Sequence, residues 1–585
     1  MIERCRLWFR AVTCSKEGPD QQSEAGEAGE TEMVIQAVTT ETVQELTHVE
    51  KAAVRTRIFQ HLAGIVVAPV VKALADRGVF AQMADSPAGV SIEEIVARTG
   101  GNRGYLRVAL RLLVSCGWMA QARTGESTLY SLTPEGKIAV WLAPLHGEVV
   151  SFIPKALFLD DFLFGKSDKA MLSHLQDLVR RARERWGIYT EGDTTAARVH
   201  RQTVDYLDGM LVGPAMVALA REGVLGGLDS PDILNPSDLP GNPRSLACVF
   251  DLLALQGWIA RDRDRVFLTA TGRYAAQIAT SYGVTVSYLP LFHVLPTLLF
   301  GNANIPRIDE SGGELLVNRG MNVWGSGGAH NSYFKKSDDI IIELFNRPLS
   351  DQPHGVCDMG CGDGSFLEHV YYTIVSKTRR GAVLETHPLV MIGADVSKVA
   401  RRITKQRLRA AGIPEFHVIR GDINRPAYLA SELERLGLDI HHLLHIRSFL
   451  DHNRPYLPPA NYSRGSRAAR TTGAFAYLGE EIPPDEMEEN MVRHLRRWAP
   501  YVGRFGLLVM ELHTLPPELT AANLDRTLAV AYDGTHGFSD QYLLEHDVFL
   551  ACAREAGLAA EERFQAKFPP SELATVSINF FKALG

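Results

Sequence analysis

The chain has 585 residues, of which 46% are hydrophobic and 22% are charged, and its formal net charge is −7. One hydrophobic core rarely serves more than about 250–300 residues, so we expect several domains in a globular protein. The negative balance excludes a general attraction to nucleic acid or to an anionic membrane surface.

Cysteine usage and apolar runs favour a cytoplasmic protein without a membrane partner. The seven cysteines are scattered, and no secretory signal precedes them, which is typical of a reducing compartment. Cys357 and Cys361 form an isolated C-x3-C, a poor zinc signature without a second pair. No uninterrupted apolar run approaches the roughly 18–20 residues that cross a membrane. The basic, amphipathic segment 1–14 leaves a targeting peptide as an alternative.

Residues 1–32 are predicted to form a disordered tail. The segment 15–32 reads SKEGPDQQSEAGEAGETE and has no apolar periodicity. Such a polar, acidic stretch cannot bury enough apolar surface to offset the entropy of ordering it.

An internal repeat follows the tail. GIVVAPVVKALADRGVF (64–80) matches GMLVGPAMVALAREGVL (209–225), and two later motifs, GW and LT followed by glycine, recur in both copies. Each copy predicts three helices and a short hairpin, which is a winged-helix pattern. We assign residues 33–170 to the first winged-helix-like repeat and 171–320 to the second, both as helical lid regions.

The third helix of each repeat does not have the composition of a DNA-reading helix. Winged helices often contact DNA through basic residues on this helix. The first copy, YLRVALRLLVSCGW (105–118), carries only Arg107 and Arg111, and the second, SLACVFDLLALQGW (245–258), carries none. We therefore expect packing helices with a structural, lid or dimerisation role, and no nucleic-acid partner.

From about residue 321 to 585, strands alternate with helices. This alternation predicts a doubly wound, Rossmann-like parallel sheet of the α/β class, and two final strands without a crossover helix predict an antiparallel terminal hairpin. The predicted strands are 355–360, 390–395, 416–422, 439–446, 505–513, 562–568 and 574–584.

A glycine-rich turn follows the first of these strands, in the sequence GVCDMGCGDGSF (355–366). Ligands of open parallel sheets bind beyond the carboxyl ends of the strands, and glycine lets the backbone pass close beneath them. The spacing is not that of a dinucleotide turn, and Asp358 and Asp363 would repel phosphates. A cationic or zwitterionic ligand fits better. The three glycines of the turn are Gly360, Gly362 and Gly364.

The next two strands also end in acids. Asp395 is placed to accept hydrogen bonds from ribose hydroxyls, and Asp422, with Ile423 beside it, is placed to bind an adenine. Three successive strand ends of this kind resemble class I S-adenosylmethionine-dependent methyltransferases over about residues 320–585. The resemblance implies S-adenosylmethionine as the cofactor and a sheet that ends in an antiparallel hairpin.

The fourth predicted strand leads into HIRSFLDHNRPY (445–456), which in the resembled family lies beside the transferred methyl group. Imidazole with carboxylate is a ligand set for Fe, Mn or Zn, and such a cation would stabilise an enolate. The alternative is that Asp451 and His452 cap a helix or pair with Arg447. A plain base is also conceivable, with His452 and His445 as the catalytic candidates.

A closer resemblance rests on the two repeats, MNVWGSGGAHNSYFKK (321–336), the glycine turn and YDGTHGFSDQY (532–542). Together they resemble the metal-dependent C-methyltransferase domains of polyketide synthase loading regions, the apratoxin type. That group uses mononuclear iron or manganese and methylates malonyl groups on an acyl carrier protein. The resemblance implies His452 as a metal ligand. The group's second ligand is a glutamine that is missing from 475–483, where Glu480 or Glu481 would replace it, and Gln541 is more distant.

Further roles follow from the same resemblance. Tyr333 would bond the methionine carboxylate of the cofactor, with aromatic packing as the alternative. His536 and Gln541 would line the substrate pocket, with ordinary loop bonding as the alternative. Acyl carrier proteins are acidic, so a basic docking face would aid encounter. There are two basic runs. Residues 462–470 form a predicted loop and are the docking candidate, whereas 401–409 are more simply interpreted as a solvated helix face.

The favoured function is therefore a metal-assisted C-methyltransferase of polyketide biosynthesis that acts on a carrier-bound malonyl or related β-carbonyl acyl group. The alternative is a small-molecule O- or N-methyltransferase of secondary metabolism, whose members often carry a single winged-helix dimerisation domain. A ligand-sensing DNA-binding protein is the third candidate. The oligomeric state stays open.

Overall fold

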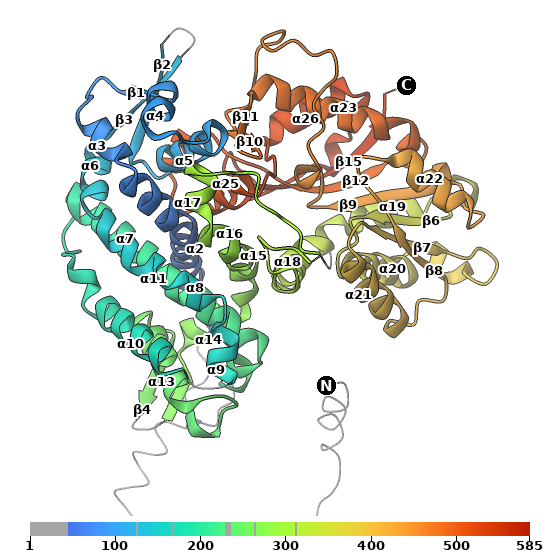
Figure 1. The fold of residues 1–585 in the computed structure, drawn as a ribbon. Helices are drawn as coiled ribbons and strands as arrows, with labels where there is room; N and C mark the ends of the chain where they lie inside the picture. The colour runs from blue at the N-terminus through green and yellow to red at the C-terminus, as the bar shows by residue number, and fades with distance from the viewer. Residues whose placement is uncertain are drawn as a thin grey trace, which may run out of the picture. The chain divides into compact units, whose positions relative to one another are not determined.

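The computed structural model describes residues 45–124, 127–165, 168–228, 236–262, 265–310 and 313–584. The predicted tail over residues 1–32 lies outside these ranges. Leu46–Gly585 form one compact unit, in which a helical region precedes the strands of the large sheet (Figure 1).

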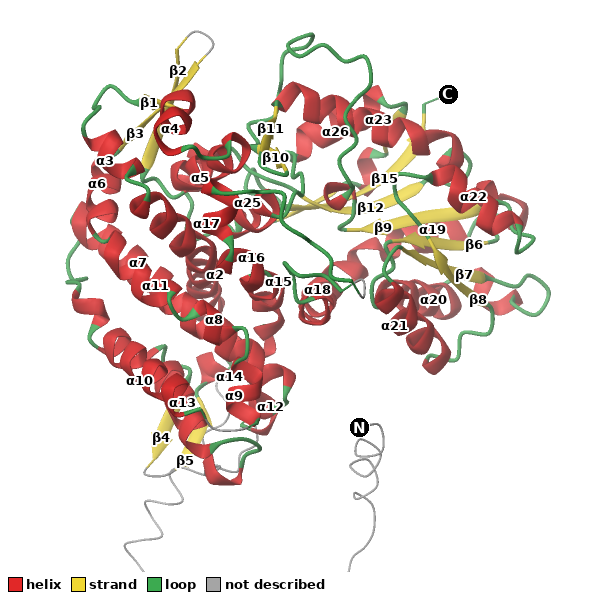
Figure 2. Ribbon diagram, in the orientation of Figure 1, coloured by secondary structure: helices red, strands yellow, loops and turns green. Residues whose placement is uncertain are grey.

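An eight-stranded sheet, in the order β13-β15-β12-β9-β6-β7-β8 with β14 paired to β15, occupies the C-terminal half (Figure 2). Strands β12, β9, β6, β7 and β8 run parallel, and β15 runs antiparallel to its neighbours. The predicted doubly wound sheet with an antiparallel end is confirmed. The strands are β6 (Gly355–Met359), β7 (Val390–Asp395), β8 (Phe416–Arg420), β9 (Leu443–Ser448), β12 (Leu507–Leu512), β13 (Leu558–Ala560), β14 (Ala566–Phe568) and β15 (Val576–Ala583).

Helices cover both faces of this sheet. Successive strand residues point to opposite faces, so Val356 packs in a cluster with α19, α20 and α21, while Cys357 packs in a cluster with α22, α23 and α26. Every residue of β6 and β12 is buried, as expected for strands covered on both sides. The helices are α19 (Asp338–Phe345), α20 (Ser365–Lys377), α21 (Lys398–Ala410), α22 (Pro426–Glu434), α23 (Pro484–Val502) and α26 (His546–Glu555).

The end of the chain differs in detail from the prediction. The segment predicted as a strand over 562–568 starts with a 3-10 turn, Glu562–Phe564, and only Ala566–Phe568 pairs with β15. An additional hairpin, β10 (Phe475–Tyr477) and β11 (Glu480–Ile482), lies outside the main sheet. Both departures involve three-residue strands, which are too short to leave a periodic sequence signal.

Two long helices, α2 (His48–Asp76) and α11 (Thr195–Arg221), cross at the centre of the helical region. A Cβ atom on Gly64 would lie 2.1 Å from the carbonyl oxygen of Tyr206, and one on Gly209 would lie 2.3 Å from that of His61. The repeat offset of 145 relates Gly64 to Gly209 and His61 to Tyr206. The contact is therefore reciprocal, as in an isologous two-fold interface, although both halves belong to one chain.

Each repeat carries the predicted helix and hairpin, and the structure explains the recurring GW and LT motifs. A Cβ atom on Gly136 would lie 1.7 Å from the carbonyl oxygen of Trp118, and one on Gly272 would lie 1.8 Å from that of Trp258. Glycine is needed because the helix after the hairpin starts directly against the tryptophan backbone. The elements are α5 (Arg103–Ser115), β2 (Met119–Thr124), β3 (Ser127–Leu132), α13 (Pro243–Leu255), β4 (Ile259–Asp262) and β5 (Arg265–Leu268).

The third helix of the first repeat, α5, packs against the C-terminal half of the chain. Its three arginines, four residues apart, lie on one face of the helix. Arg103 and Arg107 pair with Glu481 of β11, and Arg111 pairs with Asp533. The basic side chains of this helix therefore bind acids of the same chain, which confirms that α5 is a packing helix.

Helices α2 and α11 are long and apolar enough, by length and composition, to cross a membrane, a property that the search for uninterrupted apolar runs did not reveal. In each helix, 83% of the apolar window is buried inside the structure. The two helices pack mainly on one another and on their neighbours, so their apolar surface forms the core of the helical region.

The close crossing predicts that Gly64→Ala destabilises the protein by about 1–3 kcal/mol, because backbone lies where the new methyl group would sit. Urea unfolding followed by circular dichroism would measure the change. Gly226→Ala is the matched control, since a Cβ atom there meets nothing within 4 Å and alanine is the better helix former. Equal stability of the two variants would contradict the proposed crossing.

Candidate functional site

The glycine turn after β6 adopts the backbone conformation that its sequence predicts. Gly360, Gly362 and Gly364 have φ angles of +81°, +54° and +80°, the left-handed region that other residues rarely adopt. The backbone N–H of Gly360 donates to the carbonyl oxygen of Ala394 at the end of β7, at 2.7 Å. The turn is thereby held at the carboxyl edge of the sheet.

Asp358 is the most unusual polar group at this edge. It is 1% exposed, and neither carboxylate oxygen has a hydrogen-bond partner in the described part of the chain. Burial, followed by the charges of Asp395 and Asp363, raises its pKa well above the usual range. Buried polar atoms are nearly always paired, so Asp358 fits a ligand that brings a positively charged donor, as the methionine ammonium group of S-adenosylmethionine would.

Asp395 and Asp422 lie at the ends of the next two strands along the same edge. Asp395 accepts the N–H of Gly362 at 3.2 Å and that of Ser397 at 2.7 Å, and burial raises its pKa. Asp422 accepts the N–H of Asn424 at 2.9 Å. Neighbouring Ile423 is buried. Because β6, β7 and β8 are adjacent parallel strands, the three predicted acids lie along one edge of the sheet.

Asp363 is ion-paired, so its charge at the site is partly offset. Its carboxylate is 2.8 Å from a guanidinium nitrogen of Arg407 and accepts the N–H and hydroxyl of Ser365. Arg407 offsets the charge of Asp363, so Asp358 is the acid of the turn that would disfavour a phosphate ligand.

Helix α18 (Arg319–Phe334) lies against the turn and ends beside the site. A Cβ atom on Gly327 would lie 3.2 Å from an Asp363 carboxylate oxygen. The Tyr333 ring packs on Phe449, just after β9, with ring centroids 6.2 Å apart, and on Phe568 at 5.3 Å. Burial raises the pKa of Tyr333. These contacts support an aromatic packing role, and the predicted bond to a methionine carboxylate stays a prediction.

His452 forms a buried pair with an acid from the neighbouring strand. Its Nδ1 is 2.5 Å from Oε1 of Glu511, and its backbone N–H donates to Oε2 of Glu511 at 3.1 Å. Because the carboxylate accepts at Nδ1, the pair fixes the ring and leaves Nε2 for chemistry. Glu511 was missed in the sequence analysis, although an acid inside the apolar strand LLVMEL is itself a signal.

His536 of α25 (Ala529–Phe538) faces His452, with ring centroids 5.0 Å apart and the rings nearly perpendicular. Its Nδ1 bonds to the carbonyl oxygen of Tyr532 at 2.7 Å, which requires the proton on Nδ1. Burial, and to a smaller extent the neighbouring His452, lower the pKa of His536 to about 3. It is therefore neutral at physiological pH.

His445 does not join this group, contrary to its candidacy as a catalytic residue. It lies within β9 rather than at its end, and its Nε2 bonds to the carbonyl oxygen of Ile440 at 3.0 Å. Its ring packs against Trp498 of α23, and burial lowers its pKa to about 4. Strand residues point alternately to the two faces of the sheet, and His445 points to the face that α23 covers.

The predicted metal ligands are not brought together either. Glu480 is exposed on β11, whereas His452 is 4% exposed. Glu481 is held by arginines of α5. Within the described ranges, no three His, Cys, Asp or Glu side chains are grouped so that they could hold a metal ion. The ligand pair fails because the β10–β11 hairpin docks on α5 instead of on His452.

Asp451 pairs with Arg447, as the alternative to a metal-binding role predicted. Its Oδ1 lies 2.6 Å from a guanidinium nitrogen of Arg447 and 2.8 Å from Nε2 of His494. All three side chains are buried, and the Arg447 charge together with the His494 contact lowers the pKa of Asp451, against the effect of burial. The predicted pairing with Arg447 is confirmed, and it anchors the backbone beside His452.

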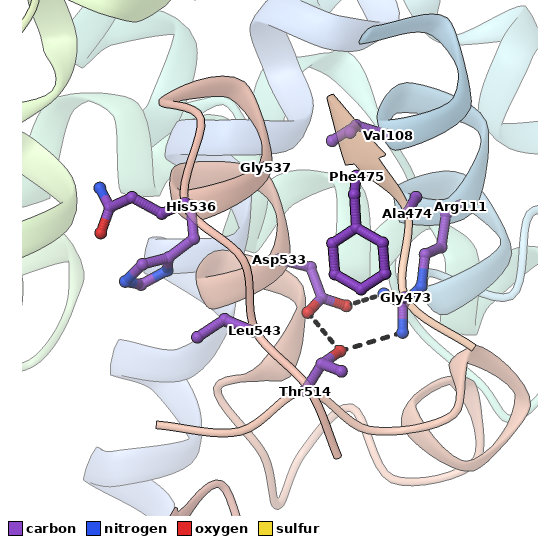
Figure 3. Close-up of a pocket in the computed structure, with 11 residues that line it drawn as sticks. Val108, Arg111, Gly473, Ala474, Phe475, Thr514, Asp533, His536, Gly537 and Leu543 are labelled. Atoms are coloured by element: carbon purple, nitrogen blue, oxygen red, sulfur yellow. Dashed lines mark hydrogen bonds and ion pairs between the residues drawn. The ribbon is translucent and has the colours of Figure 1, made fainter. Parts of the chain in front are cut away.

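The segment 532–542, predicted as a pocket wall, does line a small cavity with Arg111 and Thr514 (Figure 3). His536 and Gln541 both contribute to it. The amide of Gln541 donates to the hydroxyl of Tyr288 at 2.8 Å, so the helical region holds this end of the segment.

Three family models match the chain, and they describe its parts. Residues 314–579 match the AprA MT2-like domain, residues 54–121 the AprA N-terminal domain, and residues 208–302 the AprA winged helix domain. The chain is an AprA-type methyltransferase. As such, it is a methyltransferase enzyme. The domain boundaries drawn at 33, 171 and 321 stay predictions.

The AprA-type chain is also similar to solved methyltransferase structures. The mitomycin 7-O-methyltransferase MmcR has 14% identity, covers 67% of this chain and 100% of its own, and has a TM-score of 0.38. Human N-acetylserotonin methyltransferase has 12% identity, coverage of 68% and 99%, and a TM-score of 0.38. The CurJ carbon methyltransferase has 12% identity, coverage of 70% and 99%, and a TM-score of 0.29. No curated protein matches the chain.

The unpaired carboxylate predicts opposite effects of Asp358→Asn on stability and on cofactor binding. Because folding raises the pKa of Asp358, the stability it contributes is complete below its unfolded pKa of about 4 and is lost as the pH rises. At neutral pH without cofactor, asparagine should stabilise the protein by about 1–3 kcal/mol. Thermal melting between pH 5 and 9, with and without S-adenosylmethionine, measures both effects.

The same variant should abolish the rise in melting temperature that the cofactor causes in the parent protein. Asp363→Asn is the control, since Asp363 is paired with Arg407 and its loss should lower stability. A parent-like cofactor shift in Asp358→Asn would remove Asp358 from the binding site.

Proposed function

We propose that the enzyme transfers a methyl group from S-adenosylmethionine to the α-carbon of a malonyl or related β-carbonyl acyl group on an acyl carrier protein. The observation that carries the proposal is the buried His452–Glu511 pair, which lies beside neutral His536 at the carboxyl edge of the sheet. Attack by carbon requires removal of a C–H proton, and this pair is built to accept one.

The cofactor would be held by the three strand ends. Asp358 would receive the methionine ammonium group, Asp395 the ribose hydroxyls and Asp422 the adenine amino group. When bound, S-adenosylmethionine supplies an electrophilic methyl group and leaves as the neutral thioether. The glycine turn supports this arrangement, because it has no side chains between the backbone and the ligand.

His452 would act as the general base. Its Nε2 takes the proton from the α-carbon of the acyl group, and the electron pair of that C–H bond becomes the enolate that attacks the methyl carbon. Glu511 stabilises the imidazolium that forms and holds the ring in orientation, as a carboxylate does in other base–orienter pairs. His536, buried and neutral, helps to exclude water from the reacting atoms.

The proposed reaction does not use a metal ion. His452 would be one ligand, but the predicted second ligand, Glu480, is exposed on β11. Geometry and ligand type select a transition metal, and the residues predicted for it do not supply a second protein donor beside His452. The proton transfer is therefore assigned to His452 and Glu511, and a chelator tests the alternative.

An O-methyltransferase of small molecules is the second candidate. The His452–Glu511 pair would remove a hydroxyl proton by the same chemistry and with a smaller pKa barrier. The third candidate, a DNA-binding regulator, loses support because the arginines of α5 pair with Glu481 and Asp533.

The carrier-docking candidates also change. Loop 462–470 is largely neutralised, because Arg464 pairs with Glu486, and Arg467 and Arg470 pair with Glu488. By contrast, α21 carries exposed basic side chains at a 4-3-4 spacing, hence on one face, and none of them has an ion pair among the described residues. We propose this face for an acidic carrier protein. Its residues are Lys398, Arg402, Lys405 and Arg409.

The substrate is tested with purified enzyme, S-adenosylmethionine and malonyl-loaded carrier protein, by intact mass of the carrier. We expect a gain of one methyl group per acyl chain that is unchanged by a chelator. Loss of transfer with the chelator, restored by Fe²⁺ or Mn²⁺, would establish the metal-assisted form. Methylation of small phenols instead of the malonyl carrier would favour the O-methyltransferase.

The base is tested with His452→Gln and Glu511→Gln. Each should lower the transfer rate by about 10²–10⁴-fold, the usual contribution of a positioned base, with the cofactor dissociation constant unchanged. His441→Gln, at an exposed histidine that stacks on Tyr501, is the control and should retain the parent rate. A His452→Gln enzyme of normal rate would disprove the assignment.

A further inference from the structure

His536 lies between two acids that are both engaged by the helical region. Asp533 precedes it by three residues on α25, and Asp540 follows it by four. Asp533 is bound by Arg111 and Asp540 by Tyr105, and both partners lie on α5. The segment that presents His536 is therefore held on either side from one helix of the first repeat.

Arg111 is 5% exposed and binds through all three guanidinium nitrogens. It pairs with the Asp533 carboxylate, donates from Nε to the carbonyl oxygen of Thr472 at 3.0 Å, and donates from one terminal nitrogen to the Thr514 hydroxyl at 3.0 Å and to the Leu515 carbonyl oxygen at 2.7 Å. Such multidentate binding needs the planar fork of arginine.

Arg111 also connects the segment that carries Glu511, the partner of His452, with the helix that carries His536. Thr514 lies three residues after Glu511, the partner of His452, and its hydroxyl donates to the second Asp533 oxygen at 2.6 Å. Arg111, Asp533 and Thr514 thus form one closed group, and Figure 3 shows His536 pointing away from it on the same helix. The end of β12 and the helix α25 share this single anchor.

A second group of contacts fixes the turn after α25. The Tyr105 hydroxyl donates to Asp540 at 2.7 Å, and Arg307 binds the other Asp540 oxygen at 2.7 Å. Asp540 has a φ of +57°, a strained backbone conformation that persists only where surrounding contacts impose it. Close packing adds to this hold, because a Cβ atom on Gly537 would lie 2.6 Å from the Val108 side chain on α5.

We propose that Arg111 and Tyr105 are positioning residues for the reaction: from the first winged-helix repeat, they fix His536 against the His452–Glu511 pair. The inference rests on the proposed function in that it takes His452 as the base. It gives the repeat a role in catalysis in place of the DNA contact that its third helix makes in other winged-helix proteins. A displacement of about 1 Å at such a site can cost roughly 100-fold in rate.

Arg111→Met and Tyr105→Phe test the proposal, with Arg103→Met as the matched control. Arg103 lies on the same helix and forms ion pairs with Glu93 and Glu481, so it shares the docking surface without contacting α25. We expect Arg111→Met to lower kcat by about 100-fold and Tyr105→Phe by about tenfold, with the cofactor dissociation constant unchanged. Arg103→Met should keep the parent kcat.

A purely structural role is separated by combining variants. If Arg111 acts through the base, Arg111→Met should have no further effect on kcat in a His452→Gln background, because groups that act as a unit are not additive. Additive losses would overturn the proposal, as would a loss of kcat in Arg103→Met equal to that in Arg111→Met. The rates are compared well below the melting temperature of each variant, so unfolding does not contribute.

A readout without turnover separates this inference from the proposed substrate. Hydrogen exchange of the holoenzyme should become faster in Arg111→Met at 529–542 and 511–515, while the rest of the chain keeps its parent rate. Unchanged or uniformly faster exchange would overturn the proposal whatever the acceptor. If the malonyl carrier is not methylated and another acceptor is, only the proposed substrate fails, and kcat is measured with that acceptor.

Discussion

Asp358 is buried at the end of β6 with no hydrogen-bond partner for either oxygen within the described residues, and much of the site is arranged around that fact. A carboxylate in this state is costly in the free protein. The cost is compatible with folding if a cationic ligand later offsets it. The turn beyond it uses three left-handed glycines, in a backbone conformation that residues with side chains rarely adopt.

The parallel sheet explains why the other functional groups collect at the same edge. Strands buried on both faces leave no place for unpaired polar side chains except beyond their ends. Asp395, Asp422 and His452 all lie there. Glu511, like Asp358, is an acid inside a buried strand, and it is tolerated because His452 and two backbone N–H groups satisfy it.

The helical region contacts the site directly, through side chains of α5 that bind Asp533 and Asp540. Its two repeats pack against each other through reciprocal glycine contacts, so one chain supplies both halves of an interface that two copies of a repeat could form. That arrangement leaves α5 directed at the C-terminal half. The helix that reads DNA in other winged-helix proteins here holds Asp533 and Asp540, on either side of His536.

Sequence patterns alone determined the parts of this protein that depend on local backbone rules. The alternation of strands and helices, the glycines of the turn and the acids at three strand ends all follow from spacing, and the repeat was visible in the GW and LT motifs. Pairings between distant segments were not visible. His445 was predicted because it is near His452 in sequence, and Glu480 because of the family resemblance. Glu511 lies 59 residues after His452, and Arg111 belongs to the helical region. Only the tertiary structure decided which histidine has a carboxylate partner, because that depends on which strands are neighbours and how the helical region docks, and neither is encoded in residues close together in the chain.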